Sequence, residues 1–472
     1  MKLHTFNLLL IFSLSLLLTS CDWLNTDDAE ISTNPCFVSL SFGENDSIPN
    51  IEDADFSLEW DDLLNDSVIV NLDSLPYQTR IDSVFPYFSF YSSSSAYLLL
   101  TDSLGTGLDT IYITGTDTID FTRVISITNI AEDDTTHITY PIKVNVHKVE
   151  PELYVWQKTV DQIYSQTASM QKAVSRNGII YFYASSGIKN YLYTKKSGED
   201  WKEETVTGLP IYCNLQTIAE FNDKLYLIDD STNIYSTADG LNWQKELNSD
   251  NYKFISFLYV LNGKFWAVTH STSENIYRFA YTTTGDKWYI TNEIPTNFPV
   301  GGFTSLSFLT RNNNTKGLVL GGYTASGKLL NNVWSTENGT FWVDFTVENV
   351  TLDSLTGASI IQYDDRLMLF GGIDGYGKIA TTQYMESKDE GLSWSLPDTT
   401  YNQIREQIIN VDTTYSYYGS RSYQSVIYLK EPTSVPGSYN HNIYLIGGRD
   451  EKAKVYSDVW VGKLNRLSFL IQ

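Results

Sequence analysis

Apolar and polar residues alternate in short runs along the first third of the chain, with turn-forming residues between the runs. The clearest run is His137–Lys148, where Ile142, Val144 and Val146 alternate with polar positions. This spacing of two predicts strands with one packed face and one face in water. Similar runs predict further strands at Cys36–Phe42, Ser67–Leu72, Tyr87–Tyr91, Ala96–Leu100, Asp109–Thr114 and Thr122–Ile130.

Pro141 lies within the run His137–Lys148. Proline has no backbone N–H to donate, so we expect His137–Lys148 to lie at a sheet edge. Several short strands in a stretch of this length are typical of a β-sandwich of immunoglobulin-like type. We therefore expect residues 34–150 to form such a domain, acting as a spacer.

The rest of the chain repeats a longer pattern. A glycine stands three residues before a tryptophan five times, and these tryptophans lie 42 to 54 residues apart: Trp201, Trp243, Trp288, Trp342 and Trp394. A period of about 40 to 50 residues made of short β runs predicts propeller blades. We expect an all-β fold with six blades over residues 151–472, each centred on one apolar run: Ile179–Tyr183, Leu225–Ile228, Phe265–Val268, Leu318–Leu320, Leu367–Phe370 and Ile443–Ile446.

Three of these runs end in a pair of glycines, at Gly321-Gly322, Gly371-Gly372 and Gly447-Gly448. An aromatic residue follows twelve positions after each pair: Trp334, Tyr384 and Trp460. This order resembles the kelch repeat. The resemblance implies a propeller in which large aromatic side chains wedge between neighbouring blades.

The segment Ser387–Trp394 resembles a second repeat, the Asp-box of bacterial neuraminidases, with Asp389 and Gly391 at the family's positions. Two other segments depart from that pattern. Ser335–Trp342 has Glu337 where the aspartate belongs, and Ser236–Trp243 has Asp239 shifted by one position. The resemblance implies a turn whose carboxylate bonds its own backbone, and it implies no catalysis.

Two segments compete to complete the sixth blade. Phe469 follows Trp460 at nearly the spacing seen in other blades, which puts the final strand at the C-terminus. Tyr154–Lys158 echoes the sequence around Trp243, which makes it a closing strand from the N-terminal side. The sequence leaves both open.

The N-terminus has the features of a targeting segment. Met1–Ser20 holds Lys2 and a mostly apolar run too short to span a bilayer comfortably. Leu18-Thr19-Ser20-Cys21 resembles a bacterial lipobox, which implies cleavage before Cys21 and acylation of its thiol and amino group. The acidic tether 21–33 resembles the export signals of Bacteroidota surface lipoproteins. We expect lipid attachment to the outer membrane or cell surface.

Composition narrows the functional classes. A net charge of −24 argues against nucleic acid, because binding a polyanion needs clusters of Lys and Arg. Cys36 and Cys213 have no CxxC spacing, so they are either free thiols or one disulfide. We find no cofactor motif and no metal-ligand spacing, and therefore expect neither a cofactor nor a metal.

Loops on one face of a propeller are the expected place for a ligand, because a rigid scaffold presents them. These loops join the second strand of a blade to the third (b–c) and one blade to the next (d–a). The longest d–a connection is about Pro397–Ser420, and its length favours a functional role. The candidate contacts on these loops are Tyr323, Asp374, Tyr417, Tyr418, Arg421 and Arg449.

No nucleophile elbow, P-loop or zinc-protease motif occurs in the chain. We therefore expect a non-enzymatic lipoprotein that binds a glycan or a protein on the b–c/d–a face. The alternative is a glycoside hydrolase or polysaccharide lyase of propeller type, which requires convergent carboxylates in a central pocket.

Overall fold

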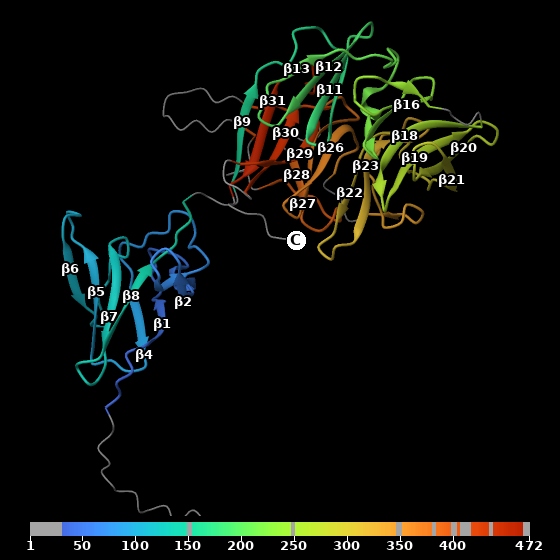
Figure 1. The fold of residues 1–472 in the computed structure, drawn as a ribbon. Helices are drawn as coiled ribbons and strands as arrows, with labels where there is room; N and C mark the ends of the chain where they lie inside the picture. The colour runs from blue at the N-terminus through green and yellow to red at the C-terminus, as the bar shows by residue number, and fades with distance from the viewer. Residues whose placement is uncertain are drawn as a thin grey trace, which may run out of the picture. The chain divides into compact units, whose positions relative to one another are not determined.

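The computed structural model describes residues 31–148, 153–246, 251–345, 352–379, 384–397, 404–405, 417–433 and 438–465. The chain divides into two compact units, Met1–Pro151 and Glu152–Gln472 (Figure 1). Within the described residues, two 3-10 turns, Ile51–Asp53 and Leu215–Thr217, accompany the strands. None of the helices in this part of the chain has the length and apolar character needed to cross a membrane. Cys21 lies outside the described residues.

Two antiparallel-rich sheets make up the first unit. One pairs β1 with β4, and the other has the strand order β2-β3-β8-β7-β5-β6. Apolar side chains from both sheets share one core, including Phe42 and Ile69. The strands are β1 (Phe37–Phe42), β2 (Phe56–Asp61), β3 (Asp66–Asn71), β4 (Pro86–Phe90), β5 (Ser95–Thr101), β6 (Leu108–Tyr112), β7 (Val124–Ile130) and β8 (His137–Lys143). Only β2 was not expected from the alternation.

The expectation that Pro141 marks an edge strand is wrong. β8 lies inside its sheet, antiparallel to β7 and parallel to β3. Pro141 is tolerated because the register with β3 begins only at Ile142, one residue later. The missing N–H of the proline therefore falls just before the ladder that would have needed it.

The second unit is built from sheets that follow one another along the chain (Figure 1). Each begins with an inner strand, and its neighbours in sequence pair antiparallel to it. The strands, sheet by sheet, are β10 (Met170–Arg176), β11 (Ile179–Ser185), β12 (Asn190–Lys196), β13 (Lys202–Glu204); β14 (Ala219–Phe221), β15 (Lys224–Ile228), β16 (Ile234–Thr237), β17 (Gln244–Lys245); β18 (Tyr252–Leu261), β19 (Lys264–Ser271), β20 (Ile276–Thr282), β21 (Trp288–Glu293); β22 (Gly301–Leu309), β23 (Thr315–Tyr323), β24 (Val333–Thr336), β25 (Val343–Asp344); β26 (Leu355–Tyr363), β27 (Arg366–Asp374), β28 (Tyr384–Ser387); and β29 (Ser425–Pro432), β30 (Tyr439–Ile446), β31 (Val459–Leu464).

The last of these sheets is completed by the first strand of the unit. β9 (Tyr154–Val160) pairs antiparallel with β31, from Leu464 opposite Tyr154 to Val459 opposite Val160 (Figure 1). Of the two closures that the sequence left open, the N-terminal one is therefore present. Phe469 lies outside the described residues.

Hydrophobic clusters fill the spaces between neighbouring sheets. For example, one cluster combines Phe279 of the β18–β21 sheet with Trp334 of the β22–β25 sheet. Another combines Phe182 of the β10–β13 sheet with Tyr444 of the β29–β31 sheet, so the last sheet packs against the first. The tryptophans of the repeat all belong to such clusters: Trp201, Trp243, Trp288, Trp342 and Trp394.

The inner strands are joined to one another by short polar side chains. The hydroxyl of Ser305 (β22) donates to the carbonyl of Leu258 (β18), and Thr356 (β26) donates to Gly302 (β22). At the junction of last and first sheets, the backbone N–H of Ala173 donates to Ser425 Oγ over 2.8 Å. Short side chains suit this role because inner strands approach each other closely. These bonds also satisfy polar groups that burial would otherwise leave unpaired.

In the turn before Trp394, Asp389 accepts the backbone hydrogen bond that the sequence predicts. Asp389 accepts from the backbone N–H of Ser393 at 2.9 Å, and Ser387 Oγ accepts from the N–H of Gly391. The expected alignment of the turn at Trp342 is wrong. Asn338, not Glu337, accepts from the turn backbone there.

In the turn at Trp342, the hydroxyl that accepts from the N–H of Gly339 belongs to Thr336 rather than to Ser335. The same holds at Trp243, where Thr237 anchors the turn and Asp239 accepts from the backbone. The physical reason is length. These turns are one residue shorter than that at Asp389, so the residue directly before the glycine is the one placed to accept.

Most of the turn glycines also make room for a side chain of the preceding sheet. A Cβ at Gly240 would lie 2.2 Å from the ring of Tyr181 (β11), and one at Gly339 would lie 2.2 Å from the ring of Trp266 (β19). The glycine of the first such turn, Gly198, has the same left-handed backbone with φ 76° but nothing within 4 Å. The glycine thus serves turn geometry everywhere and close packing at most turns.

Candidate functional site

A cavity of about 370 Å³ opens at one end of the second unit. Its lining comes from segments far apart in the sequence, and all of them are b–c or d–a connections or the strand ends next to them. The lining residues are Ser169, Met170, Gln171, Asn214, Gln216, Tyr423, Gly448, Arg449 and Val455. This volume is within the range of about 300–1,000 Å³ that is usual for small-molecule sites.

Arg449 and Tyr423 form the most distinctive part of the lining. The Arg449 guanidinium carbon lies 4.2 Å from the centre of the Tyr423 ring, within reach of a cation–π interaction. Among the described residues, the guanidinium has no ion-pair partner and no hydrogen-bond acceptor. The backbones of Ser422 and Arg449 pair with each other, which holds the two side chains together.

Tyr423 has a backbone φ of 55°, which is unusual for a residue with an aromatic side chain. Its N–H donates to Gly357 O over 2.7 Å, and its ring covers Gly357, where a Cβ would come within 2.7 Å. Strained backbone of this kind clusters at ligand sites, because the surrounding structure must enforce it. The ring is thereby fixed beside the cavity before any ligand arrives.

Amide side chains make another wall of the cavity. Gln171 Nε2 donates to Tyr456 O over 2.8 Å and to Gly448 O over 3.2 Å, while its Oε1 accepts from Tyr164. Gln216 Nε2 donates to Gln171 O over 2.7 Å. Among the described residues, no partner contacts Gln216 Oε1. The wall is therefore rigid, yet it offers a polar atom to a ligand.

The six candidate contacts have different positions in the structure. Arg449 lines the cavity. Tyr323 is 41% exposed, and burial of its hydroxyl raises its pKa, with a smaller contribution from Tyr423. Asp374 caps its own loop by accepting from the N–H groups of Tyr376 and Lys378 at 2.8 Å. Tyr417 is 56% exposed, but it is not among the lining residues.

Tyr418 and Arg421 are buried, with 5% and 4% of their surface exposed. Arg421 forms an ion pair with Asp458 and stacks on both Tyr418 and Tyr456. Burial raises the pKa of Tyr418, and the positive charge of Arg421 opposes that shift. We therefore assign this pair to packing, because a guanidinium enclosed in this way has no open edge for a ligand.

Sequence reasoning missed Gln171, Asn214, Gln216 and Tyr423. One signal was available in the sequence. If Tyr154–Lys158 is taken as the closing strand, the segment that follows it, up to Gln171, becomes a d–a connection on the face where a ligand is expected. The left-handed backbone of Tyr423 has no signal in the sequence, because tyrosine is not a residue that this conformation favours.

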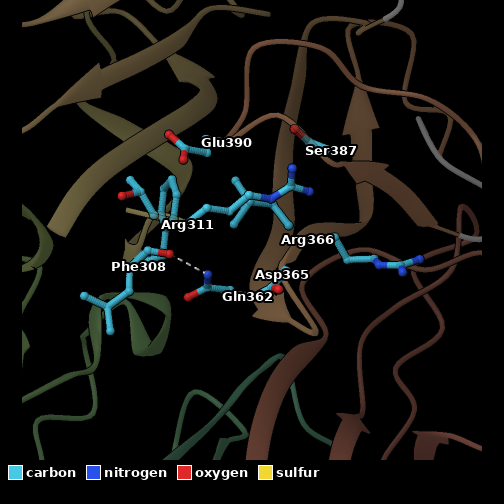
Figure 2. A pocket seen from close by; sticks show the side chains of 10 residues that line it. Phe308, Arg311, Gln362, Asp365, Arg366, Ser387 and Glu390 are labelled. Carbon is cyan, nitrogen blue, oxygen red and sulfur yellow. Dashed lines mark hydrogen bonds between the residues drawn. The ribbon is translucent and has the colours of Figure 1, made fainter. Parts of the chain in front are cut away.

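A second crevice lies at the other end of the unit, between β22–β23 and β26–β27 (Figure 2). Its volume is about 10 Å³, which is room for about one water molecule. Gln362 closes one side by donating to Leu309 O over 2.8 Å. Asp365 and Glu390 line it, but the crevice is too small for a sugar. In the described part of the chain, no group of three His, Cys, Asp or Glu is placed to hold a metal.

Both cysteines that the sequence left unassigned are free thiols. Burial raises the pKa of Cys213 to about 12, and its Sγ donates to Pro210 O. A thiol held in this protonated state is a poor nucleophile at neutral pH.

Lys172 follows the wall residue Gln171 on the inner strand β10. It is half-buried, and no partner contacts its ammonium group within the described residues. Desolvation lowers its pKa to about 8. Since no opposite charge compensates, the folded protein disfavours the charged form of this side chain.

Replacing Lys172 with methionine is expected to raise the free energy of unfolding at pH 7, by about 1–3 kcal/mol. The folded-state pKa lies below the unfolded value, so the penalty of the charged lysine is complete below pH 8. It fades between pH 8 and about 10.5, where only the unfolded state still holds the proton. Urea unfolding of both proteins from pH 7 to 9.5 tests this. A stability difference that is constant over that range would contradict it.

Comparison with known proteins places both parts of the chain. Residues 150–472 match the model of the DUF6242 beta propeller domain, which confirms the propeller expected from the sequence. Residues 34–144 match the model of the DUF6242 N-terminal domain, a domain of unknown function. No curated protein matches the chain.

Distant similarity to solved structures extends over the propeller. A streptogramin B lyase is 10% identical with a TM-score of 0.35, covering 67% of this chain and 100% of that one. YCF48 bound to D1 peptide is 11% identical with a TM-score of 0.32, covering 67% and 98%. Virginiamycin B lyase from Staphylococcus aureus is 10% identical with a TM-score of 0.33, covering 66% and 99%. The family models together span most of the chain, and the protein belongs to the DUF6242 family.

Proposed function

We propose that this protein is a binding protein whose propeller holds a glycan in the cavity beside Arg449 and Tyr423. The observation that carries the proposal is this pair: a guanidinium stacked on a strained tyrosine at the rim of a cavity of about 370 Å³. The polar side chains around this pair suit a sugar, whose hydroxyls need hydrogen bonds.

The cavity favours a glycan over a protein partner, the other ligand class considered. A stable protein interface buries about 800 Å² on each partner and has an apolar centre. The lining here combines three amides, one hydroxyl, one tyrosine and one arginine with two apolar side chains. Tyr212, which is 76% exposed two residues before Asn214, provides a further ring at the rim for an extended glycan.

The enzymatic alternative has less support at this cavity. A glycoside hydrolase places two carboxylates about 5–10 Å apart around the bond that it cleaves. Among the described residues that line the cavity, none is an aspartate or glutamate. A binding role needs only the groups that are present.

The proposal includes the architecture and location that the sequence suggests. We take the six sheets of the second unit as six kelch-like blades with Asp-box-like turns, and the first unit as an immunoglobulin-like sandwich. We take Cys21 as the acylated residue of a lipoprotein at the outer membrane or cell surface. Mass spectrometry of the mature protein purified from membranes tests the last point, and an unmodified Cys21 would contradict it.

Binding is tested on a glycan array, followed by calorimetry with the best hit. We expect Tyr423→Asn to weaken binding at least about tenfold, since the Tyr423 ring holds the Arg449 guanidinium beside the cavity and a contact of this kind contributes on the order of 1–2 kcal/mol. Asparagine is chosen because it tolerates the left-handed backbone at this position.

The matched control is Tyr376→Ala. Tyr376 is 92% exposed in the b–c loop after β27, on the same end of the unit, but it does not line the cavity. Its variant should bind like the unaltered protein. Equal loss in both variants, or an array without any hit, would refute the proposal.

A further inference from the structure

The charge of the cavity differs from the charge of the rest of the protein. The chain has 56 acidic and 32 basic residues, giving a net charge of −24. Among the described residues that line the cavity, Arg449 is the single charged group. A positive group without a lining carboxylate, in a protein this acidic, marks the cavity as a place for a negative ligand.

Among the described residues, Arg449 lacks the carboxylate partner that five other arginines of the chain have. These pairs are Arg80–Asp82, Arg123–Asp109, Arg278–Glu274, Arg366–Glu386 and Arg421–Asp458. Its neighbours Asp450 and Glu451 are engaged elsewhere. Asp450 accepts from the N–H groups of its own loop, and Glu451 pairs with Lys378.

The geometry of Arg449 also limits which anion fits. Stacking on Tyr423 fixes the plane of the guanidinium and leaves its N–H edge for in-plane acceptors. That edge matches the two oxygens of a carboxylate, which it binds through two parallel hydrogen bonds. Gln216 also lines the cavity, and its Oε1, which accepts from none of the described residues, can accept from a hydroxyl of the same ligand.

We propose that the ligand is an acidic glycan, and that Arg449 binds the carboxylate of a uronic acid residue while Tyr423 and the amide wall hold its ring. This inference rests on the proposed glycan binding and narrows it to one class of sugar.

The test compares sugars that differ only at C6. Methyl glucuronide and methyl galacturonide are titrated beside methyl glucoside and methyl galactoside, by calorimetry at 50 mM and 300 mM salt. We expect the acids to bind at least about tenfold tighter, as for charge-assisted hydrogen bonds. We expect this preference to shrink at the higher salt concentration.

Arg449→Gln should reduce the preference for the acid to less than about twofold, while Arg449→Lys keeps part of it. The matched control is Arg311→Gln, which removes the same charge from an exposed residue at the other end of the unit. That variant should leave the preference unchanged. Thermal unfolding of all three variants shows whether each one is folded.

Three results would overturn the inference. Equal binding of acidic and neutral sugars that still depends on Tyr423 would refute it and leave the proposed glycan binding intact. Tighter binding of a peptide with a free C-terminal carboxylate, or of a sulfated sugar, would refute the assignment to uronic acids. Binding of no sugar at all would remove the proposed function and this inference together.

Discussion

Replacing Gly339 with alanine is expected to lower the free energy of unfolding of the propeller by about 3–5 kcal/mol. The new methyl group would lie 2.2 Å from the Trp266 ring, which is 1% exposed and has no room to withdraw. The left-handed backbone, with φ 78°, adds about 1–2 kcal/mol for any residue with a Cβ. Chemical unfolding followed by tryptophan fluorescence measures the sum.

Gly198→Ala is the matched control for this substitution. Its turn has φ 76°, but a Cβ there meets nothing within 4 Å, so only the backbone cost of about 1–2 kcal/mol is expected. Gly391→Ala should fall between the two, because its Cβ would meet the end of the Leu318 side chain rather than a rigid ring. Equal losses in all three variants would show that close packing at these turns contributes little.

A chain that begins at residue 162, and so lacks β9, is expected not to form a stable propeller. Tyr154 and Trp156 are 2% and 1% exposed and belong to the cluster between β26–β28 and β29–β31. The loss of one such aromatic side chain costs about 3–5 kcal/mol, and β31 also loses its outer partner. The sum is comparable to the whole stability of a typical domain, about 5–15 kcal/mol.

The control is a chain that begins at residue 149, which keeps β9 and omits the first unit. It should be a soluble monomer with one cooperative thermal transition. Addition of a peptide covering residues 152–161 to the shorter chain should restore part of that transition by pairing with β31. A cooperative transition of the shorter chain alone, within a few degrees of the control, would contradict the expectation.

The sequence predicted the repeat better than the site because the two depend on different kinds of information. The glycine before Trp342 and the tryptophan itself recur at a regular interval, and packing between sheets uses them in the same way each time. The cavity joins Gln171, Gln216, Tyr423 and Arg449, which recur at no interval. These residues meet at one end of the unit only when β9 completes the last sheet. The sequence left open whether β9 does so.

The misplaced pair Tyr418 and Arg421 shows a second limit. A tyrosine stacked on an arginine is equally favourable at a ligand site and in a packed interior, since both exclude water from one face of the ring. Tyr423 and Arg449 form the same kind of pair at the cavity. The difference lies in Asp458, which neutralises Arg421 and lies 37 residues after it in the sequence.

The pairing of β9 with β31 imposes an order on biosynthesis. The ribosome makes Tyr154 and Trp156 about 300 residues before the strand that covers them, Val459–Leu464. Until that strand has emerged, these two aromatics remain without their partner and the nascent propeller keeps an open seam. Chaperones that hold unfolded chains therefore have the longest access at this seam, and completion of the domain must await the synthesis of Val459–Leu464.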